Sequence, residues 1–138
     1  MAYYEKEILE ILDNIKKTDY DYLKNKQLKK YIFLDQIFEK FRHYKKNKEN
    51  KEVIKDLVKN YELIEDINEL KKGDHVRQLN LRYFYDIRLM APYYVLNVDT
   101  QEGGKIVLKN KIYTKTIKNT SILFRLLKKD SLVKTKLI

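Results

Sequence analysis

The stretch Leu70-Lys71-Lys72-Gly73-Asp74 decides how the chain is divided, because the pattern of apolar residues changes there. Before it, apolar residues recur every three or four positions, as they do in amphipathic helices. After it, short apolar runs alternate with turn residues, as they do in antiparallel sheets. Gly73 supplies the turn or helix C-cap between the two patterns. We therefore predict an α+β protein, with a helical region over residues 1–70 and a basic β module with a C-terminal tail over residues 71–138.

Upstream of this stretch we predict three amphipathic helices, which cover residues 4–16, 20–46 and about 53–67. Thr18-Asp19 is expected to break the chain and to cap the second helix. Residues 45–51 contain no apolar side chain, and we predict a turn there, with a solvated continuous helix as the alternative. Because no heptad persists through three repeats without interruption, the helices should form a helical hairpin or small antiparallel bundle, with a long coiled coil as the alternative.

Downstream we predict five short strands, over residues 75–81, 93–98, 105–109, 112–118 and 122–127. The stretch 82–91 between the first two is ambiguous. Glycine at the end of the loop 99–104 admits the positive φ that a hairpin turn needs. Five short strands are too few for a sandwich, and they fit a small closed or half-closed antiparallel β-barrel of the SH3-like kind.

The charge of the chain is divided at the same place as the structure. Residues 1–70 hold 15 Lys and Arg against 15 Asp and Glu, whereas residues 71–138 hold 15 against 5, so the net charge of +10 lies in the β module. A region of one sign attracts polyanions or an acidic protein surface. A basic surface that only keeps the protein soluble is the simpler alternative.

Most catalytic devices lack their residues in this sequence. Cysteine is absent, the two histidines are His43 and His75, and the serines Ser121 and Ser131 lie outside any nucleophile elbow. Three glycines form no phosphate-binding motif. We therefore predict that the protein is not an enzyme and uses no metal or cofactor. The N-terminus has no leader pattern and no stretch is apolar enough to span a membrane, so we expect a cytoplasmic or nuclear protein that is not secreted.

The β module combines cations with aromatic side chains. Such a surface holds phosphates and stacks on bases, and it also suits the centre of a protein interface. Phe84 and Tyr94 are expected in the core instead. The candidate residues for binding a partner or nucleic acid are Arg77, Arg82, Tyr83, Tyr85, Arg88, Tyr93, Lys105, Lys109, Lys115 and Arg125.

About half of the chain resembles small uncharacterised proteins of large nucleocytoplasmic DNA viruses. The resemblance lies in residues 70–77, in the Gly103-Gly104 hairpin, and in the runs Ile106-Val107-Leu108-Lys109-Asn110 and Ile122-Leu123-Phe124-Arg125. It implies a helical N-terminal region before a compact β module, and a viral structural or accessory role. It transfers no catalytic residue.

We therefore expect a non-catalytic structural or assembly protein, a minor component of a large DNA virus particle, whose basic β module docks on an acidic protein surface. Residues 1–69 should associate with other subunits of the same or another kind through their helices, because residues 28–44 carry more large apolar side chains than a lone hairpin needs. A viral protein would then lie in the virion or the host cytoplasm. The alternative is a protein that binds DNA or RNA through the basic, tyrosine-rich β module.

Overall fold

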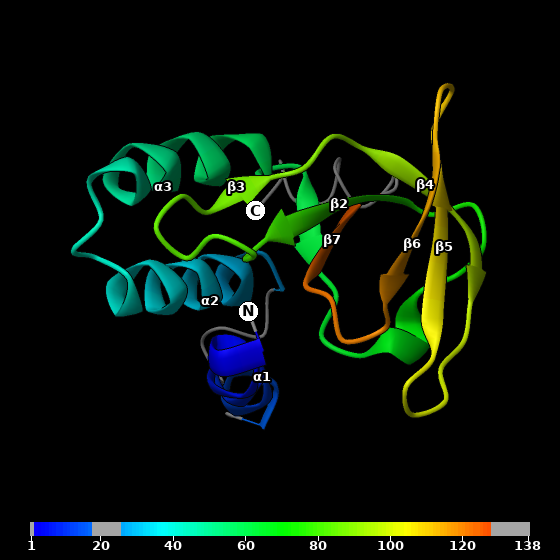
Figure 1. Cartoon of the computed structure of the whole chain (residues 1–138), viewed down its shortest axis with the longest axis horizontal. Helices are drawn as coiled ribbons and strands as arrows, with labels where there is room; N and C mark the ends of the chain where they lie inside the picture. The colour runs from blue at the N-terminus through cyan, green and yellow to red at the C-terminus, as the bar shows by residue number, and fades with distance from the viewer. Residues whose placement is uncertain (1, 18–25, 128–138) are drawn as a thin grey trace.

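The computed structural model describes residues 2–17 and 26–127, which form a layer of helices beside a curled sheet (Figure 1). The helices of this part of the chain are α1 (Ala2–Lys17), α2 (Lys26–Lys40), α3 (Lys45–Leu57) and the short 3-10 turn η2 (Ile67–Glu69). The strands are β1 (Tyr61–Leu63), β2 (His75–Asn80), β3 (Arg88–Leu89), β4 (Tyr93–Val98), β5 (Lys105–Lys109), β6 (Thr114–Lys118) and β7 (Leu123–Leu126). The predicted α+β class is confirmed.

All strand pairs are antiparallel, and the strand order is β1-β7-β2-β4-β5-β6, with β3 paired to β2 beside this path. The sheet curls, so that Lys115 on β6 reaches Gln78 on β2 with 3.5 Å between Nζ and Oε1. The sheet does not close, however, because β1 and β6 are its two ends. A closed SH3-like barrel is therefore not confirmed. Gly103 has a φ of 75°, as predicted for the hairpin between β4 and β5.

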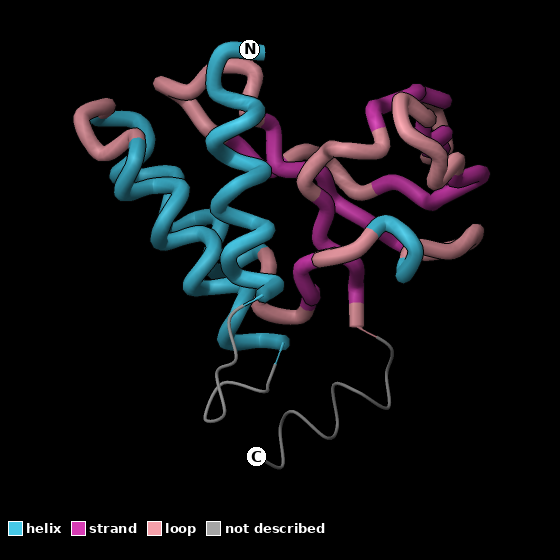
Figure 2. Tube along the Cα trace, turned by 90° about the horizontal axis from the view of Figure 1, so that it is seen from below, coloured by secondary structure: helices cyan, strands magenta, loops and turns pink. Residues whose placement is uncertain are grey.

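Each face of the sheet has its own core, and Figure 2 shows α1, α2 and α3 gathered on one side of the strands. On that side, Phe33 and Ile37 of α2 belong to one buried cluster with Leu79 and Phe124 of the sheet. The other face encloses a second cluster, which contains Val76, Val95, Ile106, Leu108 and Leu123 and is covered by Ile64 and Leu70. Neighbouring residues on β7 thus enter opposite cores, as strand geometry requires. The first cluster joins residues from both sides of the predicted division at residue 70.

Two predictions about the third helix were wrong. The helix ends at Leu57, and residues 61–63 form strand β1, because Tyr61 and Leu63 pair with Leu126 and Phe124 of β7. The apolar spacing after Leu57 therefore belongs to a strand. The predicted turn over residues 45–51 is also wrong, since α3 begins at Lys45. This polar segment forms a helix with most of its side chains in solvent and one buried amide, that of Asn47.

The first predicted helix is confirmed as α1, and the five predicted strands are confirmed as β2, β4, β5, β6 and β7, with bounds that differ by at most two residues. The ambiguous stretch 82–91 contains the short strand β3. The second helix ends at Lys40, earlier than predicted. The predicted cap at Thr18-Asp19 and the tail from Lys128 lie outside the described residues.

Most of the large apolar side chains in and just after α2 are covered within the chain, although Leu28 is 40% exposed. Phe33, Leu34, Ile37, Phe38 and Phe41 are each at most 4% exposed. Most of the apolar residues that suggested association of the helices are therefore used inside the protein, and within residues 28–44 Leu28 and Tyr44 stay exposed. Association through residues 1–69 stays a proposal and needs another surface.

Replacing Leu108 or Phe124 by Ala tests both cores. Leu108 is 1% and Phe124 is 0% exposed, so we expect the free energy of unfolding to fall by about 2 to 5 kcal/mol in each variant. Urea denaturation followed by circular dichroism measures the loss. Leu126→Ala is the matched control, because Leu126 is 37% exposed and should cost well under half as much. A loss below about 1 kcal/mol at Leu108 or Phe124 would contradict the described register.

Candidate partner-binding surface

The structure distributes the ten predicted binding residues over three places instead of one surface. Arg82, Tyr83 and Tyr85 lie in the loop between β2 and β3, beside the helices, and Arg88 follows on β3 (Figure 1). Lys105 and Lys109 lie on β5, at the opposite end of the molecule from the helices. The side chains of the remaining four, Arg77, Tyr93, Lys115 and Arg125, are partly buried against other parts of the sheet.

Two tyrosines of the loop between β2 and β3 and one that precedes α3 form an exposed cluster, which we call the tyrosine platform: Tyr83, Tyr85 and Tyr44. Their exposed fractions are 47%, 46% and 36%. The ring centroids of Tyr83 and Tyr85 are 5.6 Å apart, and those of Tyr44 and Tyr85 are 6.4 Å apart. Phe84 supports the platform from below, because its ring lies 5.5 Å from Tyr44 and 5.9 Å from the buried Phe41. The platform therefore rests on the buried cluster between the helices and the sheet, which contains Phe41 and which we call the helix-side core.

A single buried amide fixes the loop that carries the platform. Asn47 of α3 is 1% exposed, and its Nδ2 donates to the carbonyl oxygens of Phe84 (2.7 Å) and Phe41 (3.2 Å). Its Oδ1 accepts a hydrogen bond from the backbone N–H of Ile87 (2.9 Å). One side chain thus satisfies three backbone groups, just after the end of α2, between Tyr83 and Tyr85, and at Ile87 after them. The tyrosines are held in place before any partner arrives.

The cations beside the platform are engaged with a carboxylate. Asp86 lies 3.0 Å from an Arg88 guanidinium nitrogen and 3.8 Å from Nζ of Lys46, and it accepts a hydrogen bond from Asn50. Hydrogen bonds from Arg88 and Asn50 hold the pKa of the Asp86 carboxyl below its ordinary value. Arg82 lies over the ring of Tyr83, 5.4 Å from its centroid. The platform is therefore aromatic, and the three cations beside it outnumber its one carboxylate.

A second exposed surface lies on the outer side of β4, β5 and β6, and we call it the outer strand face. Strand pairing places Lys109 between Tyr94 and Thr114, Val107 beside Thr116, and Lys105 beside Lys118. The alternate residues, such as Val95 and Leu108, enter the second core. These three strands contain no Asp or Glu. Tyr94 is 55% exposed, and within the described residues Lys105 and Lys109 form no ion pair.

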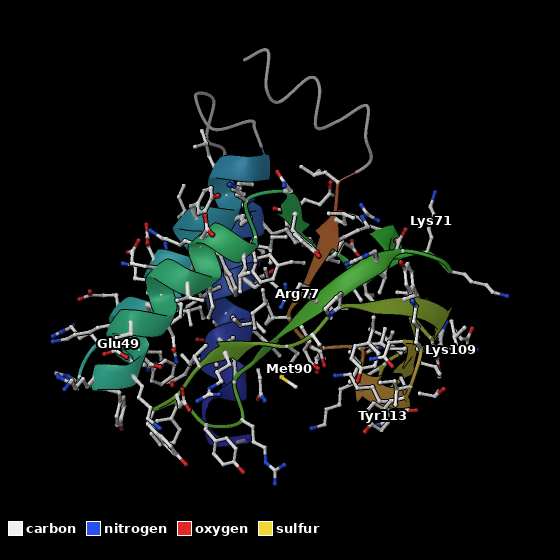
Figure 3. All side chains as sticks on the ribbon, turned by 90° about the horizontal axis from the view of Figure 1, so that it is seen from above. Glu49, Lys71, Arg77, Met90, Lys109 and Tyr113 are labelled. Carbon is white, nitrogen blue, oxygen red and sulfur yellow. The ribbon has the colours of Figure 1, made fainter. Side chains whose placement is uncertain are left out.

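The turn between β5 and β6 extends this face with a fixed apolar tip. Oδ1 of Asn110 accepts hydrogen bonds from the backbone N–H groups of Ile112 (2.9 Å) and Tyr113 (2.7 Å). Such a side-chain turn orders the backbone locally. Ile112 is 78% and Tyr113 is 64% exposed. Figure 3 shows Tyr113 and Lys109 at the same end of the molecule, opposite to Glu49 on α3.

Arg125 has a structural role. Its guanidinium donates to Glu62 on β1 (2.6 Å), to Asp74 before β2 (3.1 Å) and to the carbonyl oxygen of Glu69 (2.6 Å). Burial opposes the charge, but the hydrogen bonds that Arg125 donates to Glu62 and Asp74 outweigh it, so the pKa of Arg125 is raised. The residue joins β7 to β1 and to the turn at Gly73, and its donors are used inside the protein.

Arg77, Lys115 and Tyr93 also make internal contacts. Nε of Arg77 donates to the carbonyl oxygen of Met90 at 2.8 Å, and Figure 3 shows the two residues side by side. Nζ of Lys115 lies over the ring of Tyr93, 4.4 Å from its centroid, and burial lowers the pKa of Lys115. These side chains hold the curl of the sheet together. The exposed candidates are therefore Arg82, Tyr83, Tyr85, Arg88, Lys105 and Lys109.

His75 does not form an acid–base pair with the neighbouring Asp74. Its Nε2 shares a hydrogen bond with the hydroxyl of Tyr61 (2.8 Å), and its ring packs edge-on against Tyr94. Burial, and then the charge of Arg77, hold the pKa of His75 below its ordinary value. In the described part of the chain, no cluster of three or more His, Asp or Glu side chains is arranged to hold a metal ion.

Sequence reasoning missed four residues of these surfaces: Tyr44, Asn47, Tyr94 and Tyr113. Tyr94 was expected in the core, yet the alternation of Tyr93 to Val98 around the buried Val95 already places it on the outer side. Phe84 is half-buried on the helix-side core, as expected. No local pattern indicates that Asn47 reaches Ile87, which lies 40 residues away.

Family models, curated proteins and solved structures were compared with this chain, and none matches it. Among the described helices, none has the length and apolar character needed to cross a membrane. A functional assignment therefore rests on the geometry of the outer strand face and the tyrosine platform.

The variant Asn47→Ala tests how the platform is held. We expect a loss of about 2 to 3 kcal/mol in the free energy of unfolding, because buried backbone groups of Phe84 and Ile87 lose their partner. We also expect faster hydrogen exchange at the Ile87 amide, measured by NMR. Asn50→Ala is the matched control on the same helix, since Asn50 contacts only the side chain of Asp86 in this loop. Equal effects of the two variants would contradict the role given to Asn47.

Proposed function

We propose that this protein is a non-catalytic assembly protein that docks its outer strand face on an acidic surface of a partner protein. The observation that carries the proposal is the composition of β4, β5 and β6, which expose Lys105, Lys109 and Tyr94 and contain no carboxylate. A surface of one sign steers an oppositely charged partner and fixes its orientation.

Exposed apolar side chains favour a protein as the partner. Leu96 is 37% exposed, and Ile112 and Tyr113 project from the adjacent turn. Aromatic and aliphatic groups are the usual centre of a protein interface, and lysines are common at its rim. A phosphate backbone would leave Leu96 and Ile112 without a matching contact.

The tyrosine platform offers a second contact at the other end of the molecule. Tyr44 belongs to the helical region, so this surface is the one through which residues 1–69 would associate with another subunit. Two separate binding surfaces suit a subunit that bridges its neighbours in an assembly. The resemblance to small proteins of large nucleocytoplasmic DNA viruses supports a virus particle as that assembly, with the protein as a minor component in the virion or the host cytoplasm.

Binding to single-stranded nucleic acid is the second candidate, and the exposed rings of Tyr94 and Tyr113 among lysines favour it. The two candidates differ in their dependence on salt. If Lys105, Lys109, Lys111 and Lys118 neutralise four phosphates of a single strand, affinity should fall about fiftyfold between 50 and 200 mM salt. An interface with an apolar centre should lose less, because salt screens only its exposed charges.

Photo-cross-linking tests the proposal. A photoreactive phenylalanine analogue at Thr116, which lies on the outer strand face, should give a discrete adduct with an acidic protein when the chain is expressed in its own source. The same analogue at Glu52, exposed on α3, should give no such adduct. Protease should remove the adduct, and nuclease should leave it unchanged.

Charge reversal provides the matched comparison. The double change Lys105→Glu with Lys109→Glu should lower the yield of the Thr116 adduct at least tenfold, because both lysines flank the outer strand face. Lys6→Glu with Lys48→Glu changes the total charge equally on exposed helix positions and should have little effect. A nuclease-sensitive adduct at Thr116 would replace the assembly proposal by the nucleic-acid one. Equal adducts from Thr116 and Glu52 would contradict both.

A further inference from the structure

Strand β6 has an open edge beside the outer strand face. It is the last strand in the order of the sheet, and its pairing partner is β5. The curl of the sheet brings a side-chain contact to this strand, between Lys115 and Gln78. Within residues 2–17 and 26–127, however, no strand pairs with the edge of β6 that faces away from β5. An open edge offers backbone donors and acceptors to another chain.

Two hydrogen bonds at the ends of the hairpin formed by β5 and β6 show which residues bond across it. The backbone N–H of Asn110 donates to the carbonyl oxygen of Tyr113 at 2.9 Å, and that of Asn119 donates to Gly104 at 3.1 Å. Along an antiparallel ladder, hydrogen-bonded pairs alternate with pairs that share no hydrogen bond. Counting in steps of two from either end therefore identifies the same bonded pairs.

In β6 this count assigns the hydrogen bonds with β5 to Lys115 and Ile117. The backbone N–H and C=O groups of Thr114 and Thr116 therefore point away from β5. In the part of the chain that the structure describes, these groups have no hydrogen-bond partner, and both residues are exposed. Each residue thus presents one donor and one acceptor to an incoming strand.

The charge beside this edge favours an acidic strand. Lys109 lies opposite Thr114 on β5, and Lys111 lies in the adjoining turn. Both lysines are exposed, and neither forms an ion pair with a described residue. An added strand would lie about 4.8 Å from β6 and about 10 Å from β5. The long side chain of Lys109 can therefore reach over Thr114 to a carboxylate on the outer side of that strand.

The inner side of an added strand would meet apolar surface. Ile117 of β6 is partly buried and packs against the second core. Since side chains alternate between the two faces of a sheet, every second residue of the added strand would extend this core. The edge therefore fits a segment in which carboxylates alternate with apolar side chains.

A second copy of this chain matches the edge poorly. Two β6 strands paired across their open edges would bring together segments that carry Lys115 and Lys118 and contain no carboxylate. Like charges on paired strands are destabilising, and lysine on an edge strand opposes pairing between identical edges. An acidic strand from another protein meets no such repulsion.

We propose that the open edge of β6 receives an extended acidic segment of the partner protein as a further strand of the sheet. Thr114 and Thr116 supply the backbone hydrogen bonds, and Lys109 and Lys111 bind the carboxylates. Main-chain bonds give affinity in such complexes, and alternate side chains give specificity. This inference rests on the proposed function, because it names the part of the acidic partner that docks beside the outer strand face.

Amide hydrogen exchange, measured by NMR on the full chain, tests the strand addition. The probe is a short peptide of alternating glutamate and valine, blocked at both ends. Without the peptide, the amides of Thr114 and Thr116 should exchange rapidly and those of Lys115 and Ile117 slowly. The peptide should slow exchange at Thr114 and Thr116. Binding that leaves these two amides unprotected would overturn the proposal, and so would protection that rises with protein concentration alone, which would assign the edge to a second copy.

Two methylated peptides provide a matched comparison on the wild-type chain. One carries N-methyl groups on the glutamates and the other carries them on the valines, so they have the same charge and composition. Only alternate residues of an added strand direct their N–H groups toward β6. One peptide should therefore bind as the parent does, and the other should bind about tenfold more weakly. Equal affinities of the two would contradict the strand addition.

A proline variant locates the edge. Thr116→Pro removes an N–H group that points away from β5, and an edge strand tolerates proline at such a position. It should weaken binding of the parent peptide about tenfold, with circular dichroism as the check of folding. Thr100→Pro makes the same substitution at an exposed position in the loop between β4 and β5 and should leave binding unchanged. Equal affinities of two folded proline variants would contradict the site.

The strand addition and the proposed function can fail separately. If Lys105→Glu with Lys109→Glu abolishes peptide binding while the two methylated peptides bind equally, the strand addition is overturned and the docking of an acidic segment on the outer strand face stands. A nuclease-sensitive photo-adduct at Thr116 would overturn both.

Discussion

The structure depends on the ammonium group of Lys30, which joins the helical layer to the sheet. Lys30 lies on α2 and is 0% exposed, and its Nζ donates to the carbonyl oxygens of Val58 (2.7 Å), Lys59 (3.3 Å) and Tyr61 (2.7 Å). These carbonyls lie where α3 ends and β1 begins, and the C-terminal carbonyls of a helix attract a cation. Burial lowers the pKa of Lys30 to about 8, and the charge of Glu62 opposes this shift. Only the protonated amine has three N–H donors, one for each carbonyl oxygen. With a pKa of about 8, Lys30 is mainly protonated at neutral pH.

The positions of the exposed surfaces depend on this junction between α2 and the start of β1. With the segment before β1 fixed, β1 pairs with β7, and Arg125 on β7 binds Glu62 and Asp74 at the entry to β2. One face of β1, β7 and β2 is then covered by helices. The strands β4 to β6 lie at the other end of the molecule, so their outer side stays exposed (Figure 1). Both proposed docking surfaces are therefore positioned by contacts far from them in the sequence.

The local sequence pattern predicted those features of the fold that neighbouring residues determine. The α+β class, helix α1 and five of the strands follow from the spacing of apolar residues and from the turn residues. The exposure of Lys105 and Lys109 follows from the alternation of side chains along a strand. The strand at residues 61–63 was missed because its apolar spacing also fits a helix, and only pairing with β7 decides the matter. Arg125 was taken for a binding residue, since nothing local indicates that Glu62 and Asp74, over 50 residues away, bind its guanidinium. The tyrosine platform likewise depends on the distant contact between Asn47 and Ile87.

The central claim is that helices and sheet form one cooperative unit joined at Lys30, and native-state hydrogen exchange tests it most directly. In the wild type, amides of α2 and β7 should open with the same free energy. In Lys30→Met, the buried carbonyls of Val58 and Tyr61 and the partly buried carbonyl of Lys59 lose a donor, so the opening free energies of both sets of amides should fall together by about 3 kcal/mol. Lys48→Met should change neither. Earlier opening of α2 than of β7 in the wild type, or a loss confined to α2 in Lys30→Met, would contradict the claim.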